Sequence, residues 1–414
     1  MELDSEETFW RDLQPWLFSR GYQLRARYQP DWIPSWVTNP PAERYEVRQR
    51  EDNVRRVMDA VRARDDKPVM LKKVRKAGNE YDWELAISQY VSSPELMKDS
   101  DNHCVPVYEV LDIPNDPEHS IIVMPLLYPF HITRFDTIGE CLDFFYQIFK
   151  GIQFLHRHHI AHRTLTNAIL RDCTANNVMM DPSEIYPEGF HPVKYRMNRD
   201  YTGPASPKCT RTQCPPKYYW IDYGLSVHFE ESYKFPRAVT LRGGDKSAPE
   251  FQDIKHLHTA RDPFPTDIYY LGNLIRIYFT EGHPDNIDGY IYGLGFMKPL
   301  VDAMVQEDPS KRPTIDQCVI HLEEIICSRN PSTLRSQTRA IRASTGNFEL
   351  QKDTLLLLSL TLQPPERMVE DALQKDMAAD SVNRIWGRMS MMSDLRRLDV
   401  FLQDNALNAA EIFE

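Results

Sequence analysis

One lysine and one glutamate stand at a spacing that suits the handling of phosphate groups. Lys72 ends the apolar run Val69–Leu71, within a predicted strand at Pro68–Val74, and Glu84 opens an apolar segment twelve residues later. A lysine held on a strand binds phosphate oxygens as a point charge, provided that a carboxylate orients it. The pair alone is weak evidence, because a lysine near a strand edge is usually solvated.

Further elements of fixed spacing follow along the chain. They are Asp172 with Asn177 five positions later, Asp222-Tyr223-Gly224, Ala248-Pro249-Glu250, Asp267-Ile268-Tyr269-Tyr270-Leu271-Gly272 and Arg312. Together with Lys72 and Glu84, this ordered set resembles the eukaryotic protein kinase family over roughly residues 46–330. The leader at 21–36 and the Asp-Cys-Thr sequence after Arg171 give a narrower resemblance, to kinase-like proteins of mushroom-forming fungi.

The resemblance implies an ATP-dependent phosphotransferase that acts on protein Ser or Thr and uses Mg²⁺. Lys72 would hold the α- and β-phosphates, while Glu84 holds Lys72 in place. Asp222 and Asn177 would bind Mg²⁺ through hard oxygen ligands, and Asp172 would orient or deprotonate the acceptor hydroxyl.

The resemblance also implies a position beside the adenine of ATP. Met124 follows the apolar run Ile121–Val123 and would lie next to the base, with Pro125–Leu127, including Leu126, as the hinge. Core packing is the competing interpretation for Met124, and it would hold even in an active kinase.

Three other residues are expected to build the architecture around this site. Glu250 and Arg312 would form a buried ion pair, and Asp267 would brace the catalytic loop. The Ala248-Pro249-Glu250 segment also favours a protein substrate over a small molecule, because this segment belongs to kinases that act on proteins.

The first departure from the family lies in the catalytic loop, where the family has His-Arg-Asp without a gap. Here His162-Arg163 is separated from Asp172 by eight residues. One alignment replaces the aspartate by Thr164. The other, which we favour, keeps Asp172 with Asn177 and treats 164–171 as inserted. An insertion that leaves an arginine at both ends is typical of a gene-model error. If the insertion is real, displacement of the loop would reduce activity.

The second departure is the phosphate-covering loop, where glycine normally lets backbone N–H groups approach the phosphates. No glycine occurs from Tyr22 to Ala77, although the chain has 16. Arginine side chains would be one substitute, and the competing interpretation is a solvated basic face on a helix. The arginines concerned are Arg50, Arg55, Arg56, Arg62 and Arg64. Both departures favour the alternative function, a pseudokinase that acts as a nucleotide-binding or scaffold module.

The elements that must position these residues predict an α+β chain, with a small strand-rich half before a larger helical half. The resemblance implies a two-lobed protein-kinase-like fold. Its expected parts are a Trp- and Pro-rich leader, a β-rich N-lobe, a helical C-lobe and a helical tail, at 1–45, 46–128, 129–330 and 331–414. Two further strands are expected at Val105–Leu111 and Ile121–Leu127. Helices are expected at Glu80–Val91, Glu140–Arg157, Asp267–Thr280, Phe296–Glu307, Thr314–Cys327, Pro365–Lys375 and Ser381–Gln403.

Three stretches have no single clear pattern. The leader is expected to be irregular, with its tryptophans packed onto a domain. Glu46–Asp66 is expected to be helical or hairpin-like, and Asp181–Lys217 is a Pro-rich stretch typical of an insertion.

Composition excludes several classes of protein. The 414-residue chain has 49 basic and 60 acidic residues and a net charge of −11, which disfavours nucleic acid or an anionic membrane as a partner. No apolar run reaches the length of a bilayer crossing. Seven scattered cysteines, including the pair Cys209 and Cys214, predict reduced thiols in a cytoplasmic protein rather than a disulfide framework or a zinc site. The sequence names neither the protein substrate nor any partner of the helical tail.

Overall fold

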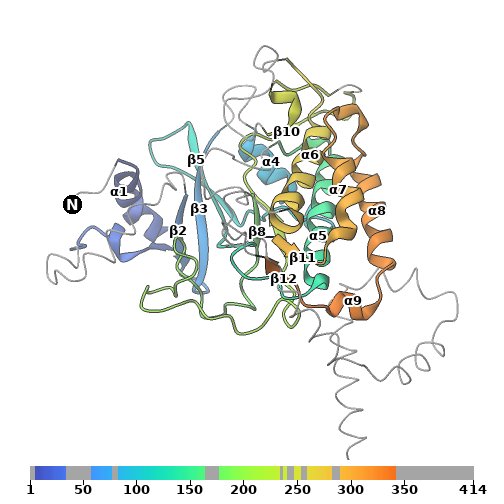
Figure 1. Ribbon diagram of the computed structural model, residues 1–414. Coiled ribbons are helices and arrows are strands. Elements are labelled where there is room, and N and C mark those ends of the chain that lie inside the picture. The colour runs from blue at the N-terminus through green and yellow to red at the C-terminus, as the bar shows by residue number, and fades with distance from the viewer. Residues whose placement is uncertain are drawn as a thin grey trace, which may run out of the picture. The chain divides into compact units, whose positions relative to one another are not determined.

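The computed structural model describes residues 5–33, 57–76, 83–163, 177–233, 236–239, 247–252, 259–281 and 290–341. The chain divides into two compact units, Met1–Asn286 with Tyr290–Arg339, and Ile287–Gly289 with Ala340–Glu414. Nearly all described residues belong to the first unit, which is α+β (Figure 1). The tail helices expected at 365–375 and 381–403 lie outside the described residues.

A five-stranded antiparallel sheet forms the N-terminal part of the first unit, with strand order β1-β2-β3-β5-β4. Its strands are β1 (Tyr22–Leu24), β2 (Val57–Arg62), β3 (Lys67–Arg75), β4 (Glu109–Asp112) and β5 (His119–Pro125). The sheet is curled, so that Tyr22 Oη on the first strand donates a 2.6 Å hydrogen bond to Glu109 Oε2 on the last. The hairpin of β2 and β3 confirms the hairpin alternative for the described part of 46–66.

Helix α1 (Ser5–Ser19) covers one face of this sheet. Its Trp10 and Leu17 are 2% and 0% exposed, and they share a core with alternate residues of the strands. The strand residues in this core include Met58, Ala60, Val69, Leu71, Ile121 and Val123. Because side chains alternate along a strand, the residues between these core positions point to the opposite face of the sheet.

The expectation of an irregular leader was wrong for residues 5–24, which form α1 and β1. The helix forms because Trp10, Leu13 and Leu17 recur at three- and four-residue spacing, which gives the segment one apolar face. The expected packing of the tryptophans is confirmed for Trp10, which is buried, and for Trp16, which packs against the same core.

The strand expected at 105–111 is shorter, because β4 covers only Glu109–Asp112. The segment before it is held elsewhere: Val105 N donates to Trp220 O at 2.9 Å, and Trp220 N donates to His103 O at 2.7 Å. These backbone hydrogen bonds tie the sheet to β9 (Tyr218–Trp220), far along the chain. Val105 therefore bonds to β9, whereas Tyr108 N donates to Val123 O of β5 at 2.8 Å.

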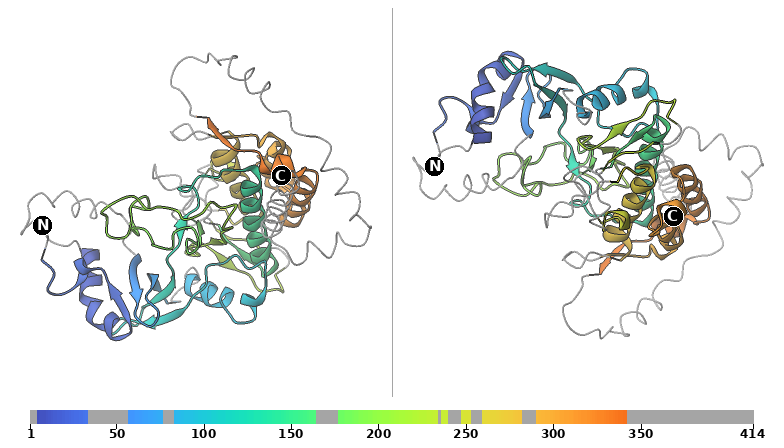
Figure 2. Two further views of the ribbon diagram at one scale, coloured as in Figure 1. Left: turned by 90° about the horizontal axis from the view of Figure 1, so that it is seen from below. Right: turned by 90° about the horizontal axis from the view of Figure 1, so that it is seen from above.

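The C-terminal part of the first unit is mainly helical. The helices are α4 (Glu84–Val91), α5 (Ile138–Arg157), α6 (Phe264–Ile275) with the π-helical turn η6 (Arg276–Thr280), α7 (Lys298–Met304), α8 (Ile315–Cys327) and α9 (Pro331–Arg335). The helices expected at 80–91, 140–157, 267–280, 296–307 and 314–327 are confirmed, with ends shifted by a few residues. In both views of Figure 2 the blue N-terminal elements lie to one side of the orange helices. Within the described ranges no helix is long and apolar enough to cross a bilayer.

Short strands complete the unit. β6 (Tyr128–Pro129), β8 (Val178–Met180) and β9 form a three-stranded sheet, and β7 (Ile160–Ala161) pairs with β10 (Val227–His228). Two more short strands, β11 (Tyr290–Tyr292) and β12 (Arg339–Ile341), follow later in the chain, and of β12 only Arg339 belongs to the first unit.

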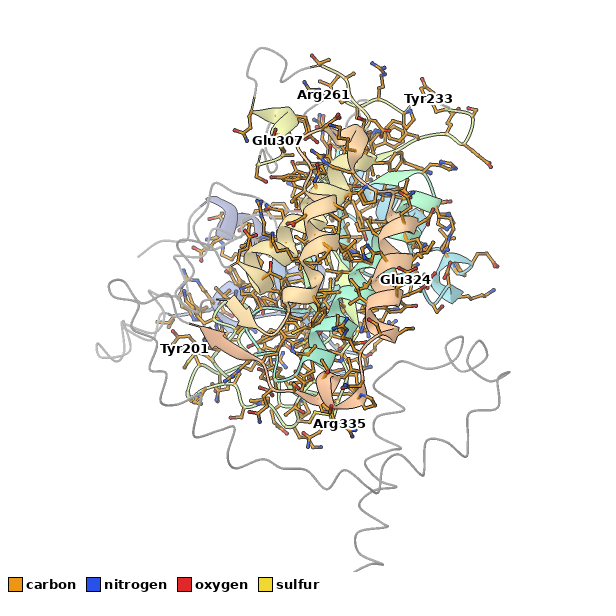
Figure 3. All side chains as sticks on the ribbon, turned by 45° about the vertical axis from the view of Figure 1, so that its right-hand side comes forward. Tyr201, Tyr233, Arg261, Glu307, Glu324 and Arg335 are labelled. Atoms are coloured by element: carbon orange, nitrogen blue, oxygen red, sulfur yellow. A yellow bond between two sulfur atoms is a disulfide. The ribbon has the colours of Figure 1, made fainter. Side chains whose placement is uncertain are left out.

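Helix α5 is the central helix of this part. Thr137 and Glu140 form a capping box at its start, in which each side chain accepts a hydrogen bond from the other residue's backbone N–H. Gly151 lies so close to β9 that a Cβ there would be 2.5 Å from Trp220 Cδ1. Phe145 packs edge-on against Phe279, with ring centroids 4.7 Å apart. Figure 3 shows side chains filling the space among these helices, with Glu324 of α8 at the surface.

The Pro-rich stretch 181–217 contains no helix or strand and is anchored by one arginine. The guanidinium of Arg211 is buried and donates to Phe130 O, to Thr133 O at 2.9 Å and to Tyr218 Oη. Among the described residues it has no carboxylate partner, so backbone carbonyls and a phenol satisfy its N–H groups. This contact holds an otherwise irregular segment against the start of the helical part.

The same stretch contains a disulfide between Cys209 and Cys214. The expectation of reduced thiols was therefore wrong for this pair, and the two sulfurs are not available as half of a zinc site. The turn between the cysteines brings their Cα atoms to 6.1 Å, within the range that a disulfide requires. Cys104, Cys141 and Cys318 are buried free thiols.

Replacement of Trp10 by alanine tests whether α1 belongs to the core of the sheet. We expect Trp10→Ala to lower the free energy of unfolding by about 3–5 kcal/mol, because it leaves a cavity among buried residues. Phe18→Ala on the same helix is the control, since Phe18 is 59% exposed, and should change stability by less than about 0.5 kcal/mol. Urea unfolding measures both, and equal midpoints would contradict the assignment.

Asp143 on α5 is a buried carboxyl with a pH-dependent effect on stability. It is 8% exposed and accepts a 2.9 Å hydrogen bond from Gln147 Nε2. Burial raises the pKa of Asp143 from 3.8 to about 6, against the opposing effects of Gln147 and Arg211. The folded state therefore holds the proton more tightly than the unfolded state. The free energy of unfolding falls as the pH rises from 3.8 to about 6.

The variant Asp143→Asn should remove this loss. We expect its free energy of unfolding to exceed that of the parent by up to about 3 kcal/mol at pH 7, and by much less at pH 4. Urea titrations from pH 4 to pH 8 measure the difference. Asp302→Asn, an exposed aspartate on α7, is the control, and parallel pH curves for Asp143→Asn and its parent would contradict the expectation.

Candidate functional site

The structure brings Lys72, Glu84 and Asp222 together on the sheet face opposite α1. Lys72 Nζ forms an ion pair with Glu84 Oε1 and lies 2.9 Å from Asp222 Oδ1. The three residues come from β3, from the first residue of α4 and from the segment after β9. The expected pairing of Lys72 with Glu84 is confirmed, and Asp222 joins it.

The pleat of β3 decides which lysine enters this cluster. Lys73, the next residue, points to the other face, where its Nζ lies 4.1 Å from the ring centroid of Phe9 on α1 and 3.4 Å from Asp116 Oδ2. Val57 of β2 is the register partner of Lys72, so these two side chains share one face.

The charges of the cluster stabilise one another. The side chains of Lys72 and Glu84 are 14% and 18% exposed, and that of Asp222 is 45% exposed. Burial disfavours the charged lysine, but the carboxylates of Asp222 and Glu84 outweigh it and raise the pKa of Lys72. Burial also acts against the charged form of Asp222, yet Lys72 lowers the pKa of this carboxyl overall. The ammonium and the Asp222 carboxylate are therefore both charged at neutral pH.

The backbone around Asp222 is shaped to place its carboxylate. Asp222 has a left-handed conformation with φ of 66°, which is uncommon for a residue other than glycine. A Cβ at Gly224 would lie 3.2 Å from Asp222 Oδ1 and 3.4 Å from Glu84 Oε2. Glycine at this position therefore leaves room for both carboxylates beside Lys72.

Asn177 lies at the same end of the β8–β9 pair as Asp222. Ile221 N donates to Asn177 O at 3.0 Å, and the next residues, Val178 and Trp220, are register partners. Asn177 is 9% exposed. Asp172 lies outside the described residues, so both alignments of the catalytic loop stay predictions.

Asp267 holds the backbone of His162 and Arg163, the last described residues before Asp172. The buried Asp267 carboxylate accepts hydrogen bonds from His162 N at 2.8 Å and from Arg163 N at 2.7 Å. His156 Nε2 also lies 3.0 Å from Asp267 Oδ2. The expected bracing by Asp267 is confirmed for the first two residues of the loop.

His162 links this loop to the segment that carries Asp222. Its Nε2 lies 3.2 Å from Ile221 O, and Ser226 Oγ donates to His162 O at 2.9 Å. Burial lowers the pKa of His162, although Asp267 and Asp222 act in the other direction. The imidazole is therefore neutral at pH 7, and its contacts are those of an uncharged hydrogen-bonding group.

Glu250 and Arg312 form the buried ion pair that the sequence predicts. Arg312 Nη1 and Nη2 donate to the two carboxylate oxygens of Glu250 at 2.9 and 2.7 Å. The side chains are 0% and 5% exposed for Arg312 and Glu250, and Thr266 Oγ1 also donates to Glu250 at 2.8 Å. Burial acts to raise the pKa of Glu250, but Arg312 lowers it overall. The pair ties the Ala-Pro-Glu segment to the end of the helical part.

Met124 and Leu126 lie next to one another at the end of the sheet. Met124 on β5 is the register partner of Met70, which shares its face with Lys72. The strand ends at Pro125, two residues before the end expected from the sequence, and Leu126 is 7% exposed. The structure places both residues near the Lys72 face, and their contact with a nucleotide stays a prediction.

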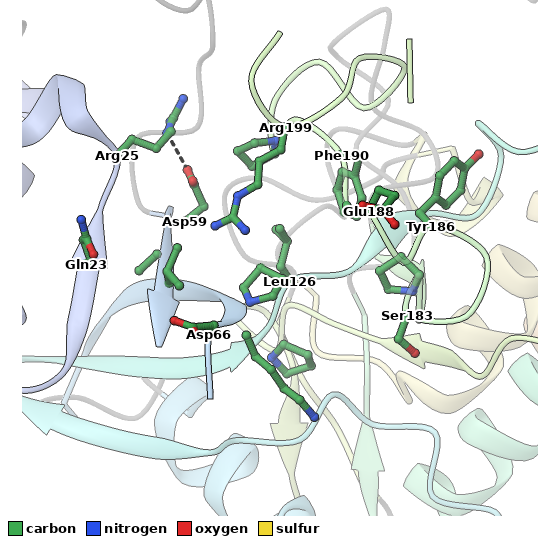
Figure 4. Close-up of a pocket in the computed structure, with 18 of the residues that line it drawn as sticks. Gln23, Arg25, Asp59, Asp66, Leu126, Ser183, Tyr186, Glu188, Phe190 and Arg199 are labelled. Carbon is green, nitrogen blue, oxygen red and sulfur yellow. Dashed lines mark ion pairs between the residues drawn. The ribbon is translucent and has the colours of Figure 1, made fainter. Parts of the chain in front are cut away.

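A cavity of about 660 Å³ borders Leu126 (Figure 4). Its sheet side includes Asp59, Val61 and Pro68, and its other side is formed by residues of the stretch 181–199. Asp59 is not among the site residues that the sequence predicts. The available signal was the alternation of Val57, Asp59 and Val61, which places one acid on an otherwise apolar face.

Two of the five candidate phosphate-covering arginines are described, and they lie elsewhere. Arg62 Nη2 pairs with Asp65 Oδ2 at 2.6 Å, and its guanidinium lies 4.7 Å from the ring centroid of Tyr108. Arg62 is the register partner of Lys67, five residues along β3 from Lys72, and Arg64 lies in the following turn. For these two residues the phosphate-covering expectation was wrong, and so was the helical alternative for Arg62. Arg50, Arg55 and Arg56 lie outside the described residues.

No protein-family model matches this chain, and no curated protein matches it significantly.

Removal of one partner from the Glu250–Arg312 pair should be costly. We expect Arg312→Met to lower the free energy of unfolding by about 3–5 kcal/mol, because it leaves a buried carboxylate without its cation. Adding Glu250→Gln should recover part of this loss, since the buried charge is then gone. Urea unfolding of the single and double variants measures the coupling, with Lys298→Met of the exposed Lys298–Asp302 pair as the control. Strictly additive losses would contradict a direct buried pair.

Proposed function

We propose that the first unit is a two-lobed, protein-kinase-like domain that transfers the γ-phosphoryl group of ATP to Ser or Thr of a protein. The observation that carries the proposal is the Lys72 ammonium held between the carboxylates of Glu84 and Asp222. Three elements far apart in sequence converge on this one cation. A lysine fixed in this way is ready to bind phosphate oxygens, and an adjacent carboxylate is ready to bind a metal ion.

The donor atoms at this centre fit Mg²⁺. The candidates are the Asp222 carboxylate and the Asn177 amide, from neighbouring strand ends. Both supply hard oxygen atoms, and Mg²⁺ commonly binds one or two carboxylates while phosphates and waters complete its octahedron. Among the residues that the structure describes, no group of three or more His, Cys, Asp or Glu could hold a metal ion alone. A metal that enters with a nucleotide suits this donor set better than a resident one.

Each residue of the chain then has a role in positioning. Lys72 would bind the α- and β-phosphates, Glu84 would keep Lys72 oriented, and Asp222 with Asn177 would hold Mg²⁺. When bound, ATP supplies the phosphoryl group and Mg²⁺ offsets the charge that develops on it. Asp172 would orient the acceptor hydroxyl or take its proton, on a loop whose start Asp267 holds.

A pseudokinase is the second candidate, and one observation favours it. No glycine occurs from Tyr22 to Ala77. Strand β2 lies within this stretch and begins at Val57, directly opposite Lys72. The chain therefore reaches the level of the proposed phosphate site without the residue that best lets backbone N–H groups approach an anion. A nucleotide-binding or scaffold module without efficient transfer would tolerate this.

Calorimetric titration with Mg·ATP, combined with phosphate-transfer assays, tests the proposal. We expect Lys72→Met to weaken Mg·ATP binding at least tenfold, because it removes the charged hydrogen-bond donor to the phosphates. Lys73→Met is the matched control, since Lys73 points to the opposite face, and should bind as the parent does. Asp222→Asn should reduce the Mg²⁺ dependence of binding.

Transfer distinguishes the two candidates. Autophosphorylation or phosphorylation of a protein acceptor that is lost in Asp222→Asn supports the kinase, whereas binding without transfer supports the pseudokinase. If the parent protein binds no Mg·ATP, or if Lys72→Met and Lys73→Met behave alike, the nucleotide-binding proposal is wrong.

A further inference from the structure

The cavity beside Leu126 contains a buried carboxylate to which the proposed function gives no role. The Asp59 side chain is 14% exposed and lines the cavity, and Arg25 Nε lies 3.0 Å from its Oδ1 (Figure 4). Arg25 Nε and Nη1 are both buried and have no hydrogen-bond partner in the described part of the chain, so the contact with Asp59 is an ion pair. Burial raises the pKa of Asp59 overall, although Arg25 acts to lower it. A desolvated acid on the wall of a cavity is costly unless hydrogen-bond donors reach it.

The register of the sheet places Asp59 close to the phosphate centre. Asp59 is the register partner of Met70, and Val57 is the partner of Lys72. Partners across a ladder share a face, and so do residues two apart on a strand, so Asp59 lies on the face of Lys72. Two residues along a strand span roughly 6–7 Å, so the Asp59–Met70 pair lies about this far along the sheet from the Val57–Lys72 pair.

The rest of the cavity is suited to a larger, flatter group. Val61, Pro68 and Leu126 supply apolar surface from the sheet side, and Tyr186 and Phe190 line the wall formed by the stretch 181–199. Arg199 also belongs to this wall, and in Figure 4 its side chain points toward Asp59. A cavity of about 660 Å³, lined by apolar side chains and by polar ones such as Arg25, Asp59 and Arg199, has the size of a small-molecule site.

We propose that Asp59 binds the ribose hydroxyls of the nucleotide, so that Asp59 is a specificity-determining residue for a ribonucleotide. This inference rests on the proposed function, in which Lys72 binds the α- and β-phosphates. The ribose is bonded directly to the α-phosphate, so it is the part of a nucleotide that lies one short step from Lys72. A carboxylate accepts hydrogen bonds from two neighbouring hydroxyl groups, and Arg25 fixes the orientation of this carboxylate. The base would then occupy the apolar part of the cavity next to Leu126.

Binding of two ligands by two proteins tests the inference. The ligands are Mg·ATP and Mg·2′,3′-dideoxyATP, and the proteins are the parent and Asp59→Asn, with affinities measured by calorimetry. For the parent we expect loss of the hydroxyls to weaken binding about tenfold or more, as for a hydrogen bond to a charged group. For Asp59→Asn we expect weaker binding of Mg·ATP and little further change when the hydroxyls are removed.

Asp66→Asn is the matched control. Asp66 also lines the cavity, but it lies in the turn after β2, next to Lys67 and beyond the level of Asp59. The variant should keep the preference of the parent for the ribose hydroxyls. Circular dichroism establishes that each variant is folded, and the comparison of ligands on the parent protein needs no variant at all.

The outcomes separate the inference from the proposed function. A parent protein that binds neither ligand overturns the proposed function, and the inference falls with it. A parent that binds both ligands equally well overturns the inference alone. So does an Asp59→Asn variant that weakens both ligands by the same factor, because Asp59 would then serve only as the structural partner of Arg25.

Discussion

The ammonium group of Lys72 is the point on which the rest of the structure depends. It lies between the carboxylates of Glu84 and Asp222, which belong to α4 and to the segment after β9. The cluster therefore forms only when both segments are correctly placed against β3. Partly buried charges are stable only when they are paired, so the cluster favours the arrangement in which β3, α4 and the segment after β9 meet. The left-handed backbone at Asp222 and the absence of a side chain at Gly224 allow these three segments to come together.

Other contacts hold the same elements from further away. The backbone hydrogen bonds between His103, Val105 and Trp220 join the approach to the sheet with β9, which ends next to Asp222. Asp267 fixes the backbone of His162 and Arg163, and His162 in turn contacts the carbonyl of Ile221. Polar groups that would be costly if left unpaired are thus used as connections between segments distant in sequence.

Local sequence patterns predicted those features of the fold that depend on residues close together in the chain. The spacing of Lys72 and Glu84 and the apolar period of the segments that form α5 and α8 lie within short windows. Asp59, by contrast, pairs with Arg25, which follows β1. Asp59 lines a cavity only because the stretch 181–199 forms the opposite side. Val105, within the segment expected to be a strand, likewise bonds to the distant Trp220. A partner so far away in the sequence leaves no periodic trace, and this also applies to the contacts of Arg211 with Phe130 and Thr133, about eighty residues away.

The adjacent lysines of β3 have a consequence for how this protein can change over evolutionary time. Lys72 and Lys73 serve opposite faces of one strand, and one joins the charge cluster while the other lies against the helix-covered core. Because the pleat repeats every two residues, gain or loss of one residue within β3 would exchange the two lysines and turn the core residues outward. A substitution on this strand therefore alters one side chain, whereas a single-residue insertion or deletion moves every following side chain of the strand to the other face. The length of β3 should be held more rigidly by selection than its composition.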